Sequence, residues 1–177
     1  MSNSKWVIDP THSEIEFKVR HLMISTVSGK FTSFNGEVES SDDNFSNASI
    51  HFSAYVNSIS TGQEPRDGHL KSDDFFNAEQ FPTLSFKSSS FSKNEDGTFV
   101  LSGDLTIRDI TKPIHLSVEH HGLMTDPYGN QKAGFELNGK INRKDFNLKW
   151  TATTEAGGIV VSDEVKIVCN IQLVKQA

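Results

Sequence analysis

Residues 48–56 have the sequence ASIHFSAYV, in which apolar and polar side chains alternate. Successive side chains of a β-strand point to opposite faces of the sheet, so this alternation predicts a strand with one buried face. Ile50 and Phe52 are expected on the buried face, and Ser49 and His51 on the opposite face. The stretch therefore indicates a sheet that covers an apolar interior on one side only.

The same alternation recurs along most of the chain, and the predicted fold is all-β. Counting in the same way gives about eight strands, at residues 14–20, 27–39, 48–56, 83–91, 98–107, 114–120, 132–141 and 164–173. Turn-forming residues separate some of them, at 94–97, at 126–130 and at the pair Gly157 and Gly158. Short connections between successive strands favour an antiparallel sheet. Closure into a barrel would remove exposed strand edges, and a sandwich is the alternative.

Several glycines fall inside or beside these predicted strands. They are Gly29, Gly36, Gly103, Gly134 and Gly139. Glycines inside strands often mark bulges, the sharp bends of a coiled barrel, or a place where another group packs against the backbone. We therefore expect strongly bent strands.

Length and composition are those of one globular domain that covers residues 1–177. The chain is 35% hydrophobic and 23% charged, which leaves enough apolar side chains for a sizeable core. A net charge of −6 argues against nucleic acid as a partner, because nucleic-acid binders concentrate Lys and Arg on one face. The single cysteine, Cys169, cannot form an intramolecular disulfide and lies on an apolar strand face, so we interpret it as a small core residue.

The N-terminal residues MSNSKWVIDP lack the apolar segment of a secretory signal. No apolar run approaches the ~20 residues that a membrane-spanning helix needs, so the protein is not expected to span a membrane. The chain as it stands is predicted to be cytoplasmic. A periplasmic location is the alternative if a signal sequence has been removed.

Residues 64–76, EPRDGHLKSDDFF, break the period of two. Pro65 suits a first helical turn, and Asp67 and Lys71 form a favourable pair four residues apart. We expect a short, imperfect helix, because Gly68 in its middle costs roughly 1 kcal/mol relative to Ala. A helix this brief is unstable alone in water, so its Leu and Phe side chains must dock on the barrel.

Phenylalanine dominates the aromatic residues, with 13 Phe against 2 Tyr and 2 Trp. A phenyl ring buries apolar area without a polar atom, so Phe suits either a packed barrel core or the wall of a dry cavity. Small barrels are filled by their own side chains, whereas barrels of lipocalin size can hold a small ligand. Composition leaves both interpretations open.

Five motifs, in this order and spacing, resemble those of the YceI-like family of polyisoprenoid-binding proteins. They are WVIDPTHSEIEFKVRHL, VSGKFTSFNGEV, SISTGQEPRDGHLKSDDFFNAEQFPTLSFKS, LSGDLTIRDITKPIHL and INRKDF, and together they extend from Trp6 to about Leu173. The resemblance implies an extended, antiparallel, eight-stranded lipocalin-like barrel with a short helical insertion. It also implies a long hydrophobic channel that holds an isoprenoid chain and, as is common in the family, a homodimer. Asp109 and Asn147 stand where the family usually has Gly, both in predicted turns.

The candidate ligand-binding residues form two groups. Arg66, Asp67 and His69 are expected at the mouth of the channel, together with the family-pattern residues Leu70, Phe75 and Phe76. Arg66 would pair there with a phosphate or quinone oxygen, or it would bridge to Asp67 or Glu64 and fix the helix. The side chains expected in the channel wall come from apolar strand faces, and they are Phe17, Val19, Phe31, Ile50, Phe52, Phe86, Leu105 and Leu137.

No catalytic or metal-binding residue is predicted. His12 and Ser13 are chain neighbours that point to opposite faces, so the histidine cannot activate the serine, and no Gly-x-Ser-x-Gly motif occurs. His120 and His121 also project to opposite faces, and no Cys or HExxH spacing supports zinc. We therefore expect no cofactor other than a bound isoprenoid lipid.

Three functions compete at this level. The first is a binding or carrier protein for a long hydrophobic chain of the isoprenoid type, such as a polyprenyl or quinone chain, which is favoured by the family motifs and the many Phe residues. The second is an enzyme that acts on a small hydrophobic substrate and uses His69 with Asp67 or Asp73 as acid and base. The third is a structural or stress-response barrel without a ligand. A hollow interior would separate the first from the third.

Overall fold

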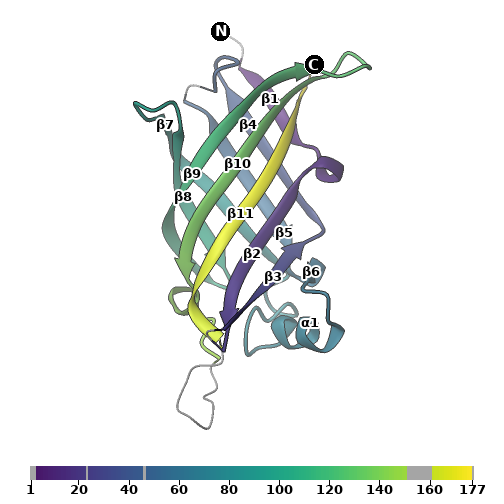
Figure 1. Cartoon of the computed structure of the whole chain (residues 1–177), viewed down its shortest axis with the longest axis vertical. Helices are drawn as coiled ribbons and strands as arrows, with labels where there is room; N and C mark the ends of the chain where they lie inside the picture. Colours follow the sequence, from purple (N-terminus) through teal and green to yellow (C-terminus); the bar gives the residue numbers. More distant parts are fainter. Residues whose placement is uncertain (1–2, 23, 46, 151–160, 177) are drawn as a thin grey trace.

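The computed structural model describes residues 3–22, 24–45, 47–150 and 161–176, whose strands form one antiparallel sheet (Figure 1). The strands are β1 (Ser4–Ile8), β2 (Glu14–His21), β3 (Ser25–Phe31), β4 (Phe34–Ser40), β5 (Ser49–Tyr55), β6 (Ile59–Ser60), β7 (Thr83–Lys93), β8 (Phe99–Ile107), β9 (Ile110–Thr125), β10 (Gln131–Asn142) and β11 (Val161–Lys175). The described ranges also contain the α-helix α1 (Glu64–Lys71) and the 3-10 helices η1 (Pro10–His12), η2 (Val56–Ser58) and η3 (Arg143–Phe146).

The sheet closes on itself, which confirms the predicted eight-stranded barrel. β1 pairs with β4 on one side and with β11 on the other, and this completes the ring β1-β4-β5-β7-β8-β9-β10-β11. β11 is long enough to pair with β2 as well, where Ile167 lies opposite Phe17. Closure pairs both edges of each strand in the ring, which a sandwich does not achieve.

The prediction of a single strand at residues 27–39 is wrong. The structure divides this segment into β3 and β4. Between them, the backbone N–H of Thr32 donates to the carbonyl of Ser58 at 3.1 Å, and the carbonyl of Ser33 accepts from the backbone N–H of Tyr55 at 3.0 Å. These bonds satisfy backbone groups that leave the ladder, so the chain can bend here. The alternation also missed β1 and β6, which have only 5 and 2 residues.

Strand glycines allow inward side chains to lie against the backbone of the neighbouring strand. A Cβ atom at Gly29 would lie 2.3 Å from Cζ of Phe17, so the phenyl ring occupies the space that any larger residue would need. Gly134 instead adjoins the register shift between β9 and β10. The shift at Gly134 is the bulge that a strand glycine leads one to expect.

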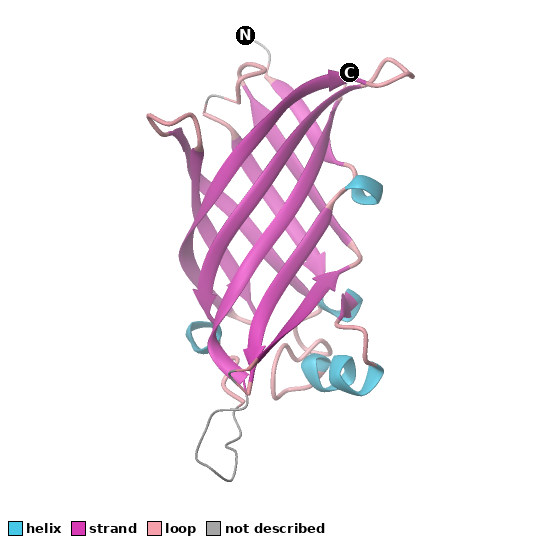
Figure 2. Cartoon of the chain, in the orientation of Figure 1, coloured by secondary structure: helices cyan, strands magenta, loops and turns pink. Residues whose placement is uncertain are grey.

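The helix α1 lies outside one end of the barrel, next to η2 and β6 (Figure 2). Leu70 packs against the core, and Phe75 is buried. Arg108, in the turn between β8 and β9, donates through Nη1 to the carbonyls of Asp73 and Phe75, both at 2.9 Å. Tertiary contacts therefore hold this segment, as its short length requires. Within the described ranges, no helix has the length and apolar character needed to cross a membrane.

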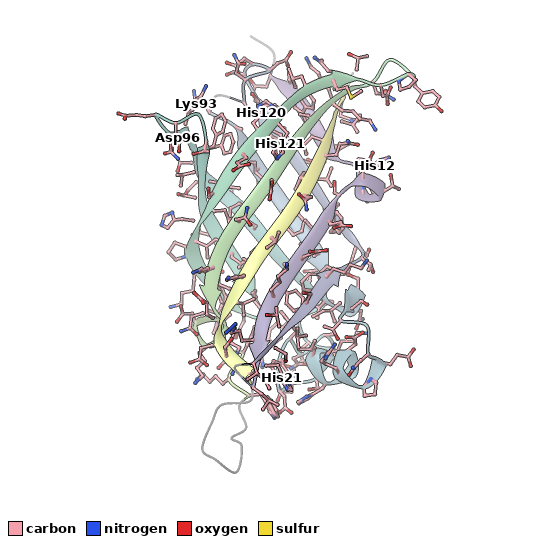
Figure 3. All side chains as sticks on the ribbon, in the orientation of Figure 1. His12, His21, Lys93, Asp96, His120 and His121 are labelled. Atoms are coloured by element: carbon pink, nitrogen blue, oxygen red, sulfur yellow. The ribbon has the colours of Figure 1, made fainter. Side chains whose placement is uncertain are left out.

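The two ends of the barrel differ in what covers them. Figure 3 places His120 near the end that carries both chain termini, and His21 near the end that carries α1. We call the first the ring end, because the rings of Trp6, Phe45, His120 and Phe135 pack together there. We call the second the helix end, and it consists of α1, η3, the end of β2 and the start of β3.

Candidate ligand cavity

An apolar cavity of about 400 Å³ occupies the barrel interior, within the range of roughly 300 to 1,000 Å³ that is typical of small-molecule sites. Its lining follows β11 from Val161 to Leu173. This span is roughly 40 Å along the strand, and the usual tilt of barrel strands reduces it to roughly 30 Å along the barrel axis. The cavity is therefore a long channel.

Inward-facing side chains of the strands form the channel wall. The wall residues expected from the sequence all line the cavity, and they are Phe17, Val19, Phe31, Ile50, Phe52, Phe86, Leu105 and Leu137. Phe31 and Phe86 are buried, whereas Phe17 and Ile50 remain half-buried although they face inward. Partial exposure on an inward face arises because these side chains border open space. The interior is hollow and is not filled by its own side chains.

Four packed rings close the channel at the ring end. The ring centroid of Phe45 lies 5.1 Å from that of Trp6, 5.0 Å from that of Phe135 and 5.4 Å from that of His120. Trp6 is 0% exposed and Phe45 is 1% exposed. Burial lowers the pKa of His120 below its usual value, so the imidazole is neutral at neutral pH and packs as an apolar ring. Phe45 also lines the cavity and forms its floor.

Half-buried side chains border the channel at the helix end. The ring of Trp150 lies 4.8 Å from that of His69 and 5.5 Å from that of Phe75. Nε2 of His69 lies 2.8 Å from Oδ2 of Asp74, so the pairing of His69 with Asp73 that the sequence leaves open is wrong. The sequence also gives no signal for Trp150, a single aromatic residue outside any strand pattern.

The residues expected at the mouth divide into two sets. Arg66, His69, Leu70, Phe75 and Phe76 line the cavity, whereas Asp67 does not. Instead of the expected bridge to Asp67 or Glu64, Arg66 donates through Nε to Oγ1 of Thr61 at 2.7 Å and through Nη2 to the Thr61 carbonyl at 2.8 Å. Asp67 accepts hydrogen bonds from the backbone N–H and the hydroxyl of the same threonine. Thr61 therefore connects the two charged side chains.

Arg143 is a second arginine in the lining, and its side chain is 3% exposed. It donates to the carbonyls of Leu148 and Trp150 through Nη1, and to those of Ser162 and Val161 through Nε and Nη2. Burial lowers the pKa of the guanidinium, and the charge of Asp163, 3.6 Å away, opposes that effect. Arg143 thus serves structure at the helix end, and the pattern of the sequence does not reveal this role.

Cys169 lies in the channel wall, as its place on an apolar face suggests. It is 7% exposed, and burial raises the pKa of its thiol to about 12. The thiol therefore stays protonated at neutral pH and behaves as a small apolar group.

Two histidines that are not part of the lining, His12 and His121, have acidic partners on the outer surface. His12 lies 2.8 Å from Asp9, while the hydroxyl of Ser13 accepts from the backbone N–H of Gln172, so the two neighbours have separate partners as expected. His121 faces outward beside Glu136.

One group of possible metal ligands lies on the outer surface of β9 and β10. Glu119, His121 and Glu136 place one ligand atom each within 4.8 Å of one another. The sequence does not predict this group, because strand pairing brings Glu136 opposite Glu119. Two of the three side chains are exposed and the group faces away from the channel, so it has no part in the cavity described above.

Comparisons with known proteins agree with this architecture. A model of the YceI-like domain family matches residues 6–173. A UPF0312 protein of Staphylococcus aureus (strain N315) is 35% identical over 164 residues, which cover 92% of this chain and 93% of the relative. The crystal structure of a Campylobacter jejuni YCEI protein is 30% identical and has a TM-score of 0.76, covering 89% of this chain and 90% of that one.

A more distant structure shares the fold. It is a polyisoprenoid binding domain from Saccharophagus degradans, implicated in plant cell wall breakdown, with a TM-score of 0.69 and 15% identity. The match covers 97% of this chain and 98% of that domain. At this identity the likeness concerns the fold alone.

Proposed function

The chain belongs to the YceI-like domain family, and from this premise we propose that it binds a long apolar chain of the isoprenoid type inside its barrel. The observation that carries the proposal is the continuous apolar channel between the ring end and the helix end. A polyisoprenoid binding domain of the same fold supports the choice of ligand class.

In an apolar channel, affinity increases with the length of the bound chain, and selectivity between similar chains is low. Each CH2 group removed from water contributes ~0.8 kcal/mol, so a chain of several isoprene units supplies a large gross driving force. Part of it offsets the ordering of the chain. A hydrophobic wall distinguishes single methylene groups by only ~1 to 3 kcal/mol, so related chains should bind with similar affinity.

A binding protein accounts for the cavity better than an enzyme does. His69, the candidate acid or base, contacts Asp74 on its polar side and the rings of Trp150 and Phe75 on the other. The wall residues supply apolar surface, which suits retention of a chain. A carrier or storage role therefore follows more directly than turnover.

The proposal is tested by filling the channel. Ile167 lines it, whereas the next residue, Val168, does not and faces outward. Ile167→Trp should abolish binding of geranylgeraniol, and Val168→Trp should leave it within about threefold of the unmodified protein. Binding is measured by titration of delipidated protein, with native mass spectrometry of protein purified from its host as a second measurement.

Two results would contradict the proposal. One is equal binding by the two tryptophan variants, which would place the ligand outside the channel. The other is absence of any lipid in the native spectrum together with no uptake of prenyl chains, which would favour a barrel that works without a ligand.

A further inference from the structure

The channel lining contains three arginines, Arg20, Arg66 and Arg143, and the first two meet no carboxylate within ion-pair distance in the part of the chain that the structure describes. Arg20 is exposed, so water solvates its charge, whereas Arg66 is partly removed from water. Arg143, in the same lining, lies 3.6 Å from Asp163 and donates to four carbonyls. Arg66 is half-buried and donates to Thr61 alone. A cation partly removed from water needs a partner, and the neighbouring protein groups supply only neutral oxygens.

The guanidinium of Arg66 is held in one orientation. The hydroxyl of Thr61 donates to Oδ1 of Asp67 at 2.5 Å, and its lone pairs are then free to accept from Nε of Arg66 at 2.7 Å. The backbone N–H of Thr61 donates to the same carboxylate oxygen at 2.8 Å, which fixes the threonine itself. Asp67 therefore positions Arg66 through Thr61, although Asp67 does not reach the channel.

This arrangement leaves one edge of the guanidinium for a ligand. Nε and Nη2 are occupied by Thr61, while Nη1 has no hydrogen-bond partner among the described residues. An arginine held in this way matches the paired oxygens of a carboxylate or phosphate. His69 is less available, because its Nε2 already lies 2.8 Å from Asp74.

Resting on the proposed function, we propose that the helix end binds the anionic headgroup of an amphiphilic lipid, a phosphate or carboxylate, through Arg66. The apolar chain then extends from Arg66 toward Phe45 at the ring end. Arg66 binds the headgroup directly, and Thr61 and Asp67 are positioning residues that orient Arg66. The chain supplies affinity, and the charge decides which class of lipid is retained.

The test compares headgroups on matched chains. Delipidated protein is titrated with geranylgeranyl phosphate and geranylgeraniol, and with oleate and oleyl alcohol, so that phosphate and carboxylate are distinguished. The unmodified protein should bind at least one anion roughly 10- to 100-fold more tightly than its alcohol, the range expected for a hydrogen-bonded ion pair. Inorganic phosphate alone should not bind measurably, because the chain provides most of the affinity.

Three variants identify the source of that preference. Arg66→Gln should reduce the affinity ratio of anion to alcohol to about one. Arg66→Lys should keep part of this preference, because Lys retains the charge but lacks the paired N–H donors of the guanidinium. Thr61→Val should reduce the ratio to an intermediate value, because Arg66 loses the hydroxyl that positions it. Lys166→Gln removes an exposed cation of β11 that is not part of the lining and should leave the ratio unchanged.

The outcomes separate this inference from the proposed function. Equal binding of anion and alcohol by the unmodified protein, or an unchanged ratio in Arg66→Gln, would overturn the headgroup site while the channel remains. Failure to bind any of the four lipids would overturn both. Circular dichroism of each variant checks the fold, and if Arg66→Gln does not fold, Arg66→Lys and Thr61→Val decide the question.

Discussion

The two ends of the barrel use the same kinds of side chain to different effect. At the ring end, Trp6 and Phe45 are 0% and 1% exposed, and their rings pack into a closed floor. At the helix end, Trp150 and His69 form a similar ring contact at 4.8 Å, yet both remain half-buried. Paired strands supply most of the first cluster, while α1 and the segment after η3 supply the second. Trp6 and Phe45 are thus fully buried at the ring end, whereas two of the three rings at the helix end, those of His69 and Trp150, keep part of their surface exposed.

The sharpest test of this difference is loss of a tryptophan at each end. Trp6→Ala should lower the free energy of unfolding by about 3 to 5 kcal/mol, because it empties a fully buried site. Trp150→Ala should cost less than about half of that, since the side chain is half-buried. Urea denaturation followed by circular dichroism measures both, and equal losses would contradict the distinction between the ends.

A conservative variant refines the same measurement. Nε1 of Trp6 is buried without a hydrogen-bond partner among the described residues. Trp6→Phe removes this unsatisfied donor, which costs roughly 1 to 3 kcal/mol when buried, and so offsets part of the lost packing. We expect it to be clearly more stable than Trp6→Ala.

The next prediction concerns the floor of the channel. Phe45→Ala should lower the free energy of unfolding by about 3 kcal/mol, because the ring packs against Trp6 and Phe135. The opened floor should also admit longer chains, so the longest prenyl alcohol that binds should increase in a length series. Phe75→Ala at the helix end is the control, because its loss should leave that maximum length unchanged.

A smaller effect is expected in the wall between the two ends. A Cβ atom at Gly29 would lie 2.3 Å from the ring of Phe17, so Gly29→Ala must push that ring into the channel. Overpacking of this kind costs about 1 to 3 kcal/mol and should weaken prenyl-alcohol binding. Stability from urea curves and affinity from titration should fall together, and unchanged affinity would show that the ring moves elsewhere.

The smallest effect is expected in α1, with the opposite sign. Gly68 has open space where a Cβ atom would lie, and its backbone does not require glycine. Gly68→Ala should therefore stabilise the helix by up to about 1 kcal/mol. Hydrogen exchange of the α1 amides should slow, whereas exchange at the ring end should not change.

The channel wall could be predicted from the sequence, because the period of two assigns each strand residue to a face. Phe52 and Phe86 lie directly opposite each other in β5 and β7, and both line the channel. The barrel follows from the same alternation with short connections. The break between β3 and β4 could not be predicted, since it depends on hydrogen bonds to η2, which lies 26 residues away at Ser58.

The helix end was less accessible to sequence reasoning. Arg66 and Asp67 could be selected as candidates by their charge, but neither composition nor spacing shows that Thr61 joins them. Trp150 and Arg143 lie outside the strand pattern, so no periodicity marks them as part of the lining. Contacts made by connecting segments depend on the path of the chain in three dimensions, which the alternation does not encode.

Arg143 has a practical consequence for the connection between η3 and β11. A single side chain holds the carbonyls of Leu148 and Trp150 before residues 151–160 and those of Val161 and Ser162 after them. One guanidinium therefore bonds to carbonyls in two segments of the chain, the end of the η3 region and the start of β11. Arg143→Ala should leave all four carbonyls without this donor at once, so the two segments should loosen together.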